Sequence, residues 1–389
     1  MNFLYNTFVA PEIPEEQSGA NTIYKLRDRL ELETASTDRR STVQALKALS
    51  NDYKELVGEQ CLNLLTALFI EEKDDTTLVN YYLETFENLF NVEKVGDKED
   101  LGYIFGAQFA KNNGALNKLF ECLSSSDFYL RYNGIRVVQL LKSSASGYVQ
   151  SGLLTNPLAL ASIVDLLDDE REIIRNEGLL VLIALTESNM EIQKIMAFQN
   201  VFEKVLDTIE MENGIDGGII VQDCLFLILN LLNDNLSNQN FFRESSYIPR
   251  LLKLLIPLTE QFSPNDWQDP QRVNNILKLS DLIRVLTKPN ATHTKDNQNA
   301  LVRSGFLDIL IQIITLPVLP RILHAHFLFC VGNIIRDNRN NQDKFISITL
   351  KNEESLHHEP FIIHLVSLAV EDDVDDIVRI GATFAFQVD

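Results

Sequence analysis

The chain has 389 residues, of which 45% are hydrophobic, with only 16 glycines and 11 prolines. This composition supplies enough apolar surface for a continuous core and excludes a disordered protein. The 55 acidic residues outnumber the 34 basic ones and give a formal net charge of −21. That charge argues against a nucleic-acid groove, which needs clustered Lys and Arg, and against direct docking on an anionic membrane. A basic surface on a partner protein is the better match, although acidic charge also serves solubility.

In chain order, we expect residues 1–20 to form a flexible lead-in and residues 21–389 to form one continuous array of helices. The first helices are predicted at Thr22–Leu32, Arg39–Leu49, Val57–Phe69 and Leu78–Phe90. A charged surface loop is expected at Glu93–Asp100, and from Leu101 the pattern becomes regular. No Pro/Gly/Ser-rich linker divides the chain, as expected for a solenoid that grows by adding repeats.

The stretch Ile219–Leu255 shows the repeating unit most clearly. Its first helix, Ile219–Leu232, is apolar nearly all round, so it must be covered on more than one side. It is too short to span a bilayer, which needs about 20 residues, so other protein must cover it. A polar turn, a short piece around Gln239 and a second amphipathic helix from Tyr247 follow.

A glutamine at the start of the short piece marks each copy of this unit. The copies carry Gln150, Gln193, Gln239, Gln298 and Gln342, separated by 43, 46, 59 and 44 residues. The long step coincides with an enlarged loop at Thr259–Gln271. A period in the 40s is typical of armadillo or HEAT repeats, and the separable short helix favours armadillo. We therefore predict an all-α fold, an armadillo-like α-solenoid whose three-helix repeats of about 43–46 residues form a superhelix.

Two further stretches carry local predictions. The sequence NGIDGG at Asn213–Gly218 predicts a turn with positive φ angles. The acidic run Glu371–Asp376 is expected at the start of the last helix, where carboxylates favour the helix N-terminus. The chain ends at Asp389, about two turns into that helix, without the polar terminal repeat that a solenoid needs. We therefore expect the solenoid to be truncated at its C-terminal end.

The sequence lacks the motifs of common catalytic sites. It contains no GxxxxGK[ST], no HExxH and no serine in a nucleophile elbow, so we predict no enzymatic activity and no cofactor. His357, His358 and His364 with Glu359 are interrupted by Pro360 and do not have metal-ligand spacing, so no metal site is expected. The singletons Cys61, Cys122, Cys224 and Cys330 are predicted to be buried reduced thiols, which favours the cytosol.

Three residues are candidates for partner binding. Asn230 and Asn333 each lie nine residues before a repeat glutamine, on helices that are otherwise apolar. In armadillo proteins such an asparagine often points into the concave groove and binds the backbone of an extended peptide. The alternative is that these amides satisfy buried backbone groups at a helix end, and Ala184 at the equivalent position of the preceding repeat favours it. Trp267, in a polar loop, is the third candidate, because exposed Trp is enriched in binding hot spots.

Several stretches resemble the globular head of the general vesicular transport factor family. They are Thr22–Gln60, Asp165–Glu210 and Gly217–Leu251, together with the shorter Asp266–Ile276 and Asn297–Gly305. The resemblance implies an armadillo-like head without enzymatic activity, which acts in vesicle tethering in ER-to-Golgi and intra-Golgi transport. It implies a cytoplasmic protein, peripheral on Golgi and transport-vesicle membranes, whose membrane contact is indirect.

The partners that the resemblance implies are a Rab GTPase, golgins, and SNARE or coat proteins. Members of this family form homodimers through a long coiled coil, but these 389 residues contain no heptad region, so dimerisation is an expectation for the full-length protein. A second interpretation stays open: an armadillo regulator of another class, such as a chaperone nucleotide-exchange factor or a peptide-binding transport adaptor.

Overall fold

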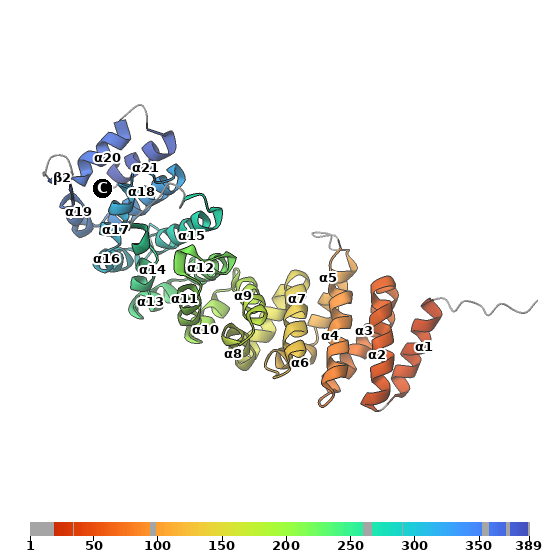
Figure 1. The fold of residues 1–389 in the computed structure, drawn as a ribbon. Helices are drawn as coiled ribbons and strands as arrows, with labels where there is room; N and C mark the ends of the chain where they lie inside the picture. The colour runs from red at the N-terminus through yellow and green to blue at the C-terminus, as the bar shows by residue number, and fades with distance from the viewer. Residues whose placement is uncertain are drawn as a thin grey trace, which may run out of the picture. The chain divides into compact units, whose positions relative to one another are not determined.

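The computed structural model describes residues 19–33, 35–93, 99–259, 267–289, 291–351, 358–370 and 374–387. It divides into two compact units, Met1–Gly152 and Leu153–Asp389, whose helices are labelled in Figure 1. The predicted lead-in at residues 1–18 lies outside the described residues, and Gly19 and Ala20 already belong to the first helix.

The first unit consists of seven helices among the residues described. They are α1 (Gly19–Leu32), α2 (Ser36–Asp52), α3 (Lys54–Glu71), α4 (Thr76–Phe90), α5 (Leu101–Ala110), α6 (Asn113–Leu123) and most of α7 (Phe128–Thr155). All four predicted N-terminal helices are present, each one to three residues longer at one or both ends. The core is aromatic: the Phe86 ring stacks on Phe90 at 5.6 Å and meets Phe69 edge-on at 5.5 Å. These fully buried rings join α3 to α4.

Helix α7 contains a break shortly before Gln150. Asp127 caps its N-terminus by accepting a hydrogen bond from the Leu130 amide at 3.0 Å. At Ala145 the backbone leaves the helical region, with φ −149° and ψ 31°. Gln150, predicted to open a separate short helix, therefore lies in the last part of α7, and the break at Ala145 replaces the expected turn.

The second unit repeats a triplet of helices four times (Figure 1). The long helices are α9 (Glu172–Thr186), α12 (Ile219–Leu232), α15 (Pro270–Leu286) and α18 (Arg321–Ile335). The short ones, which carry the glutamines, are α10 (Met190–Phe198), α13 (Leu236–Glu244), α16 (Thr294–Ser304) and α19 (Arg339–Ile346). The third members are α11 (Val201–Met211), α14 (Ile248–Lys253), α17 (Phe306–Ile314) and α20 (Phe361–Val370). The predicted three-helix armadillo repeat is thereby confirmed.

The remaining elements of the second unit extend or connect these triplets. Helix α8 (Pro157–Asp165) precedes the first triplet, and α21 (Asp376–Gln387) is a fifth long helix. Three 3₁₀ turns, η1 (Leu166–Asp168), η2 (Gly214–Asp216) and η3 (Ile256–Thr259), follow α8, α11 and α14. Two short strands, β1 (Thr349–Lys351) and β2 (His358–Pro360), pair antiparallel, with Leu350 opposite Glu359. This ribbon includes His358 and Glu359 of the histidine stretch considered for metal binding.

Two tight corners recur in the triplets, and both use left-handed backbone. Between long and short helices the corner residue has φ near +55°, as at Ser188, Asp234 and Asp337. Between short and third helices it is Asn200, Ser246 or Gly305, with φ 63°, 62° and 99°. Short polar residues and glycine tolerate this conformation best. The predicted turn at Asn213–Gly218 also contains it, at Asn213 and Gly214.

The core of the second unit lies where successive long helices contact each other and where they contact the short and third helices of the triplets. In α12 the side chains of Ile228, Leu231 and Leu232 are fully buried, as the all-round apolar pattern predicted. An asparagine caps each of three short helices, because the side chains of Asn189, Asn235 and Asn338 accept hydrogen bonds from amides in the first turn. Asp375 does the same for α21, so the predicted role of the acidic run holds for its described part.

Candidate partner-binding surface

Each long helix of the second unit has two equivalent positions seven residues apart, and both are apolar on every long helix except α15, where the second is Ser280. These pairs are Ile173 and Leu180 on α9, Ile219 and Phe226 on α12, Val273 and Ser280 on α15, Ile322 and Phe329 on α18, and Ile377 and Phe384 on α21. All members except Ser280 are exposed or half-exposed. Since successive long helices contact each other, the pairs form a continuous row, which we call the long-helix face.

Asn230 lies on this face, but its amide is already engaged. Its Nδ2 donates to the carbonyl oxygen of Ile183 at 3.2 Å and lies 3.5 Å from Thr186 Oγ1. The amide therefore links α12 to the end of α9, the arrangement that the alternative sequence interpretation describes. Asn88 on α4 of the first unit makes the same kind of link, to the Lys47 carbonyl at 3.3 Å and Ser50 Oγ at 2.9 Å.

Asn88 was missed because no repeat glutamine follows it in the sequence. The local signal was present: both asparagines lie two residues before the end of a long helix, and the helix to which each one bonds carries a hydroxyl residue in its last turn, Ser50 on α2 and Thr186 on α9. Asn333 on α18 is only 9% exposed, and its carbonyl oxygen accepts a hydrogen bond from Gln298 Nε2 at 2.8 Å. A role of Asn230 or Asn333 in partner binding stays a prediction.

Trp267 is half-buried and lies beside the first turn of α15. The Arg272 guanidinium lies 5.7 Å from the centre of its ring, and Arg272 Nε is 2.9 Å from Asp216 Oδ1. Cation–π contact of this kind orders an indole ring and covers part of it. A role of Trp267 in partner binding also stays a prediction.

The long-helix face carries an unusual carboxylate at Asp223, one turn from each apolar position of α12. Among the described residues this side chain forms no ion pair and no hydrogen bond. Its half-buried site raises the pKa of the carboxyl group through desolvation. On the neighbouring helix, Lys278 Nζ lies 5.7 Å from the centre of the Phe226 ring.

Three of the repeat glutamines, Gln193, Gln239 and Gln298, form a buried amide ladder behind this face. Gln193 donates a hydrogen bond to the carbonyl oxygen of Thr186 at 2.8 Å, and Gln239 donates one to that of Leu232 at 2.9 Å. Thr186 and Leu232 are the last residues of the preceding long helices. Each glutamine then accepts a hydrogen bond from the next triplet, as Gln193 Oε1 does from Asn235 at 2.9 Å. The same link joins Gln239 to Asn297 and Gln298 to Asn338. The glutamines that revealed the repeat therefore stabilise the stack.

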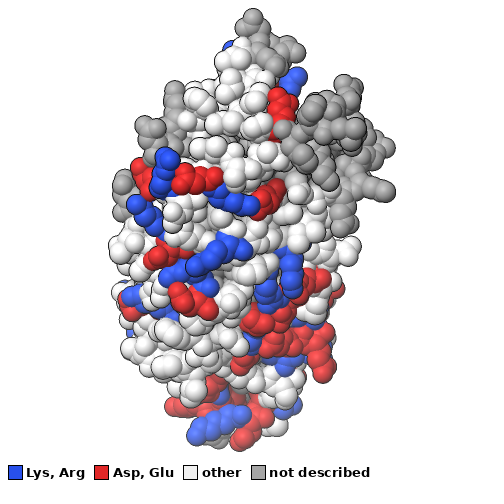
Figure 2. All heavy atoms as spheres, turned by 90° about the vertical axis from the view of Figure 1, so that its left-hand side faces the viewer, with Lys and Arg blue, Asp and Glu red and all other residues white. Residues whose placement is uncertain are grey.

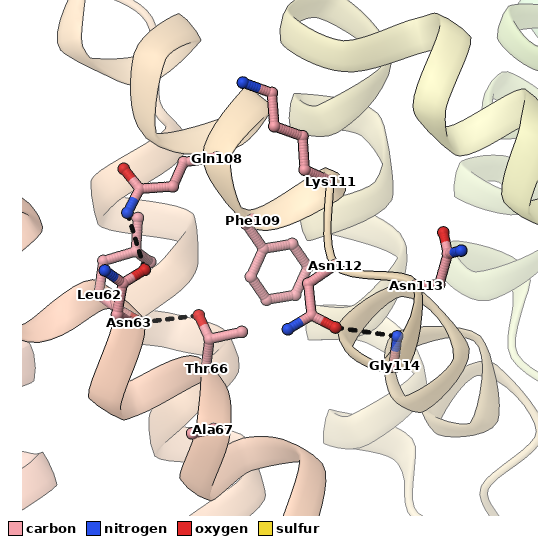
Figure 3. A pocket seen from close by; sticks show the side chains of 10 residues that line it. All are labelled: Leu62, Asn63, Thr66, Ala67, Gln108, Phe109, Lys111, Asn112, Asn113 and Gly114. Carbon is pink, nitrogen blue, oxygen red and sulfur yellow. Dashed lines mark hydrogen bonds between the residues drawn. The ribbon is translucent and has the colours of Figure 1, made fainter.

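The first unit contains a surface pocket of about 530 Å³ between α3, the end of α5 and the start of α6 (Figure 3). Amide side chains dominate its rim: Gln108 Nε2 donates to Asn63 Oδ1 at 2.8 Å, and Asn112 accepts from the Gly114 amide at 3.0 Å. Lys111 is the one charged residue of its lining, which includes no carboxylate, imidazole or thiol. This lining offers hydrogen bonds but no nucleophile paired with a base.

The described residues show no grouping of His, Cys, Asp and Glu that could hold a metal ion. Of the predicted histidine cluster, His357 lies outside the described residues. All four cysteines are buried and free of disulfides, as predicted. Burial raises the pKa of the Cys61 thiol to about 11, so it is protonated at neutral pH.

Acidic and basic side chains alternate on the face shown in Figure 2 and form no continuous basic area there. Within the second unit, Arg250 contacts the carboxylates of Glu203, Asp207 and Glu210 at 3.2, 2.7 and 2.9 Å. A search of the described helices finds none that is by itself long and apolar enough to cross a membrane; only α12 and α13 pass as a pair, bent by 117°.

The fold and its surfaces define the class of protein: an armadillo-like α-solenoid that offers extended faces for contact with other macromolecules. A designed armadillo repeat protein, solved in complex with the peptide (KR)4, covers 70% of this chain and 98% of its own with a TM-score of 0.51. Its sequence identity is 16%, so this likeness supports the fold alone. No protein-family model matches the sequence.

Relatives with curated names are more specific. General vesicular transport factor p115 of Bos taurus is 35% identical over 100% of this chain, which spans 41% of that relative. Intracellular protein transport protein uso1 of Schizosaccharomyces pombe is 32% identical over 90% of this chain and 33% of its own length. A crystal structure of Uso1-2 covers 100% of this chain and 62% of that one, with a TM-score of 0.88 and 26% identity.

The chain therefore matches the head region of the general vesicular transport factor family, as the sequence resemblance predicted. These relatives are named as transport factors and not as enzymes. The chain spans about two fifths of the length of the p115 relatives that it matches.

Proposed function

We propose that this chain is the protein-binding head of a vesicle-tethering factor in ER-to-Golgi and intra-Golgi transport. The observation that carries the proposal is the match to vesicular transport factor p115 along the whole chain. In the proposed role the head has no catalytic activity and recruits a Rab GTPase together with Golgi or vesicle proteins, namely golgins, SNAREs or coat proteins. Its contact with the membrane is then indirect, through these partners.

The surface best suited to this task is the long-helix face of the second unit. It combines exposed large apolar side chains with few charges, which is the composition of an interface core. Asn230 and Asn333 lie along it and Trp267 lies at the start of α15, so we include these three residues in the proposed contact surface. Homodimerisation and a peripheral location on Golgi and vesicle membranes belong to the proposal for the full-length protein.

The proposal is tested by retention of purified Rab GTPases on the immobilised chain. Each Rab protein is loaded with GTP or with GDP, and the bound fraction is measured at physiological salt. We expect at least one Golgi or ER Rab to bind in its GTP form and to be released in its GDP form. Equal retention of both forms by every Rab tested would contradict the proposal and would favour an armadillo adaptor or a chaperone regulator.

A further inference from the structure

Four exposed side chains on α9 and α12 form an apolar square on the long-helix face. They are Ile173 and Leu180 on α9 and Ile219 and Phe226 on α12, with exposed fractions of 45%, 43%, 53% and 40%. Within each helix the pair is two turns apart, about 10.5 Å along the axis. The link from Asn230 to the end of α9 fixes the register of the two helices, so that equivalent positions lie side by side.

The middle of this square is acidic. Asp223 lies four residues after Ile219 and three before Phe226, which places it on the same side of α12. Glu177 holds the equivalent position on α9 and is half-exposed. A partly desolvated carboxylate without a cation among the described residues is an unfavourable arrangement for a free surface. A partner that brings a Lys or Arg to Asp223 and apolar groups to its rim would satisfy both the charge and the apolar side chains.

The geometry distinguishes two forms of such a partner. An extended peptide needs a row of free side-chain amides for its backbone. Along this face the Asn230 amide is bound to α9, and the equivalent positions on α9 and α15 are Ala184 and Arg284. An amphipathic helix satisfies its own backbone and needs only side-chain contacts, and its residues i and i+7 match the spacing of the square.

We propose that the apolar square of α9 and α12 binds an amphipathic helix of a partner protein whose apolar face carries one basic residue, which pairs with Asp223. The inference rests on the proposed function in one respect, because it specifies the chemistry of a partner on the same face. Phe226 and Leu180 then supply the apolar contacts, and Glu177 adds negative charge beside Asp223.

The probe is a fluorescein-labelled 18-residue helical peptide with leucines at i, i+3, i+4 and i+7 spacing and one central lysine on the apolar face. Its binding to the full chain is followed by fluorescence anisotropy at physiological salt. A scrambled peptide of the same composition measures non-specific attraction to the acidic protein. A second peptide carries glutamate in place of the central lysine.

We expect the lysine peptide to bind at least tenfold more tightly than the scrambled one. Phe226→Ala should weaken this binding at least tenfold, whereas Phe198→Ala, at a site 74% exposed on α10, should leave it unchanged. Asp223→Lys should reverse the preference in favour of the glutamate peptide. Because both altered residues of the square are at least partly exposed, circular dichroism should show an unchanged fold.

Equal binding of the helical and scrambled peptides, or an Asp223→Lys variant that still prefers the lysine peptide, would overturn the inference. Tighter binding of a proline-containing extended peptide of the same composition would overturn it as well. Peptide binding combined with no nucleotide-dependent Rab retention would contradict the proposed function and leave this surface assignment intact. The opposite pair of results would contradict this inference alone.

Discussion

At the scale of single residues, buried amides hold the repeats in register. Asn238 shows this most clearly: it is 1% exposed, and its Nδ2 donates to the carbonyl oxygens of Gln193 and Leu231 at 3.0 and 2.9 Å. One carbonyl belongs to the previous triplet and the other to its own long helix. A single side chain therefore satisfies backbone groups that water cannot reach, across an interface between repeats.

We expect Asn238→Ala to lower the free energy of unfolding by about 1–3 kcal/mol, because two buried carbonyl oxygens lose a donor. Urea denaturation of the chain measures this change. The matched control is Asn274→Ala on the exposed side of α15, which should change stability by less than about 0.5 kcal/mol. A loss at Asn238 no larger than that of the control would contradict the role of the amide ladder.

A second residue-scale prediction concerns acid stability. Burial, together with the nearby His364, lowers the pKa of His324 to about 4. The unfolded chain therefore binds a proton at His324 between about pH 6.5 and 4 while the folded chain does not. The free energy of unfolding is therefore unaffected by His324 above about pH 6.5 and decreases as the pH falls towards about 4.

The measurement is the free energy of unfolding of wild type and His324→Gln between pH 7 and 5. The wild type should lose stability with falling pH more steeply than the variant, since the variant cannot take up this proton. Parallel slopes for wild type and His324→Gln would show that His324 is not a buried neutral group.

At the scale of helices, hydrophobic periodicity and the repeat glutamines were sufficient to predict the triplets. Ile219–Leu232 was predicted with the same bounds as α12, because its ends coincide with turn-forming Gly and Asn residues. The pattern separated the piece that carries Gln150 from the helix before it, but it did not show that the backbone turns at Ala145, because several Ser and Gly residues in that stretch could form the turn. Leu229 belongs to the nearly all-round apolar pattern of this helix and is nevertheless half-buried, because a helix covered from several sides still leaves one stripe open.

The candidate site was predicted only in part, for a similar reason. Asn230 and Asn333 were identified by their distance from the repeat glutamines, which locates them on the long-helix face, and their role in binding stays a prediction. Whether the side-chain amide of each asparagine is already hydrogen-bonded depends on the long helix of the preceding repeat. Sequence spacing within one repeat carries no information about the position of that helix. The apolar square was not predicted, because exposed and buried apolar positions look alike on helices such as α9 and α12.

The left-handed corners give an element-scale prediction. Gly305 has φ +99° between α16 and α17, a conformation that costs residues with a Cβ about 1–2 kcal/mol. Gly305→Ala should therefore destabilise the chain by about that amount in thermal or urea denaturation. Gly218→Ala is the matched control, because its φ is −74° and an added Cβ meets nothing within 4 Å. Equal effects at the two glycines would contradict a strained corner.

The packing of the long helices predicts which helices lose protection from hydrogen exchange after a core substitution. Leu231 is fully buried in α12, so Leu231→Ala should cost about 2–5 kcal/mol. In a solenoid each repeat contacts its neighbours, and hydrogen exchange should therefore increase first in α12 and the adjoining α9 and α15. Leu236→Ala, at a site 38% exposed, serves as the control. A uniform increase along all helices of the second unit would contradict nearest-neighbour stabilisation.

At the scale of the whole molecule, the proposed protein-binding role rests on the match to transport factors and on a row of exposed apolar positions. The measurement that tests this most directly is a cell-free ER-to-Golgi transport assay with the isolated chain added in excess. A head that binds transport partners should compete with the endogenous tether and inhibit transport in proportion to its concentration. A Leu180→Asp, Phe226→Asp double variant that keeps its helical content should lose this inhibition. Equal inhibition by wild type and double variant, or none by wild type, would contradict the account.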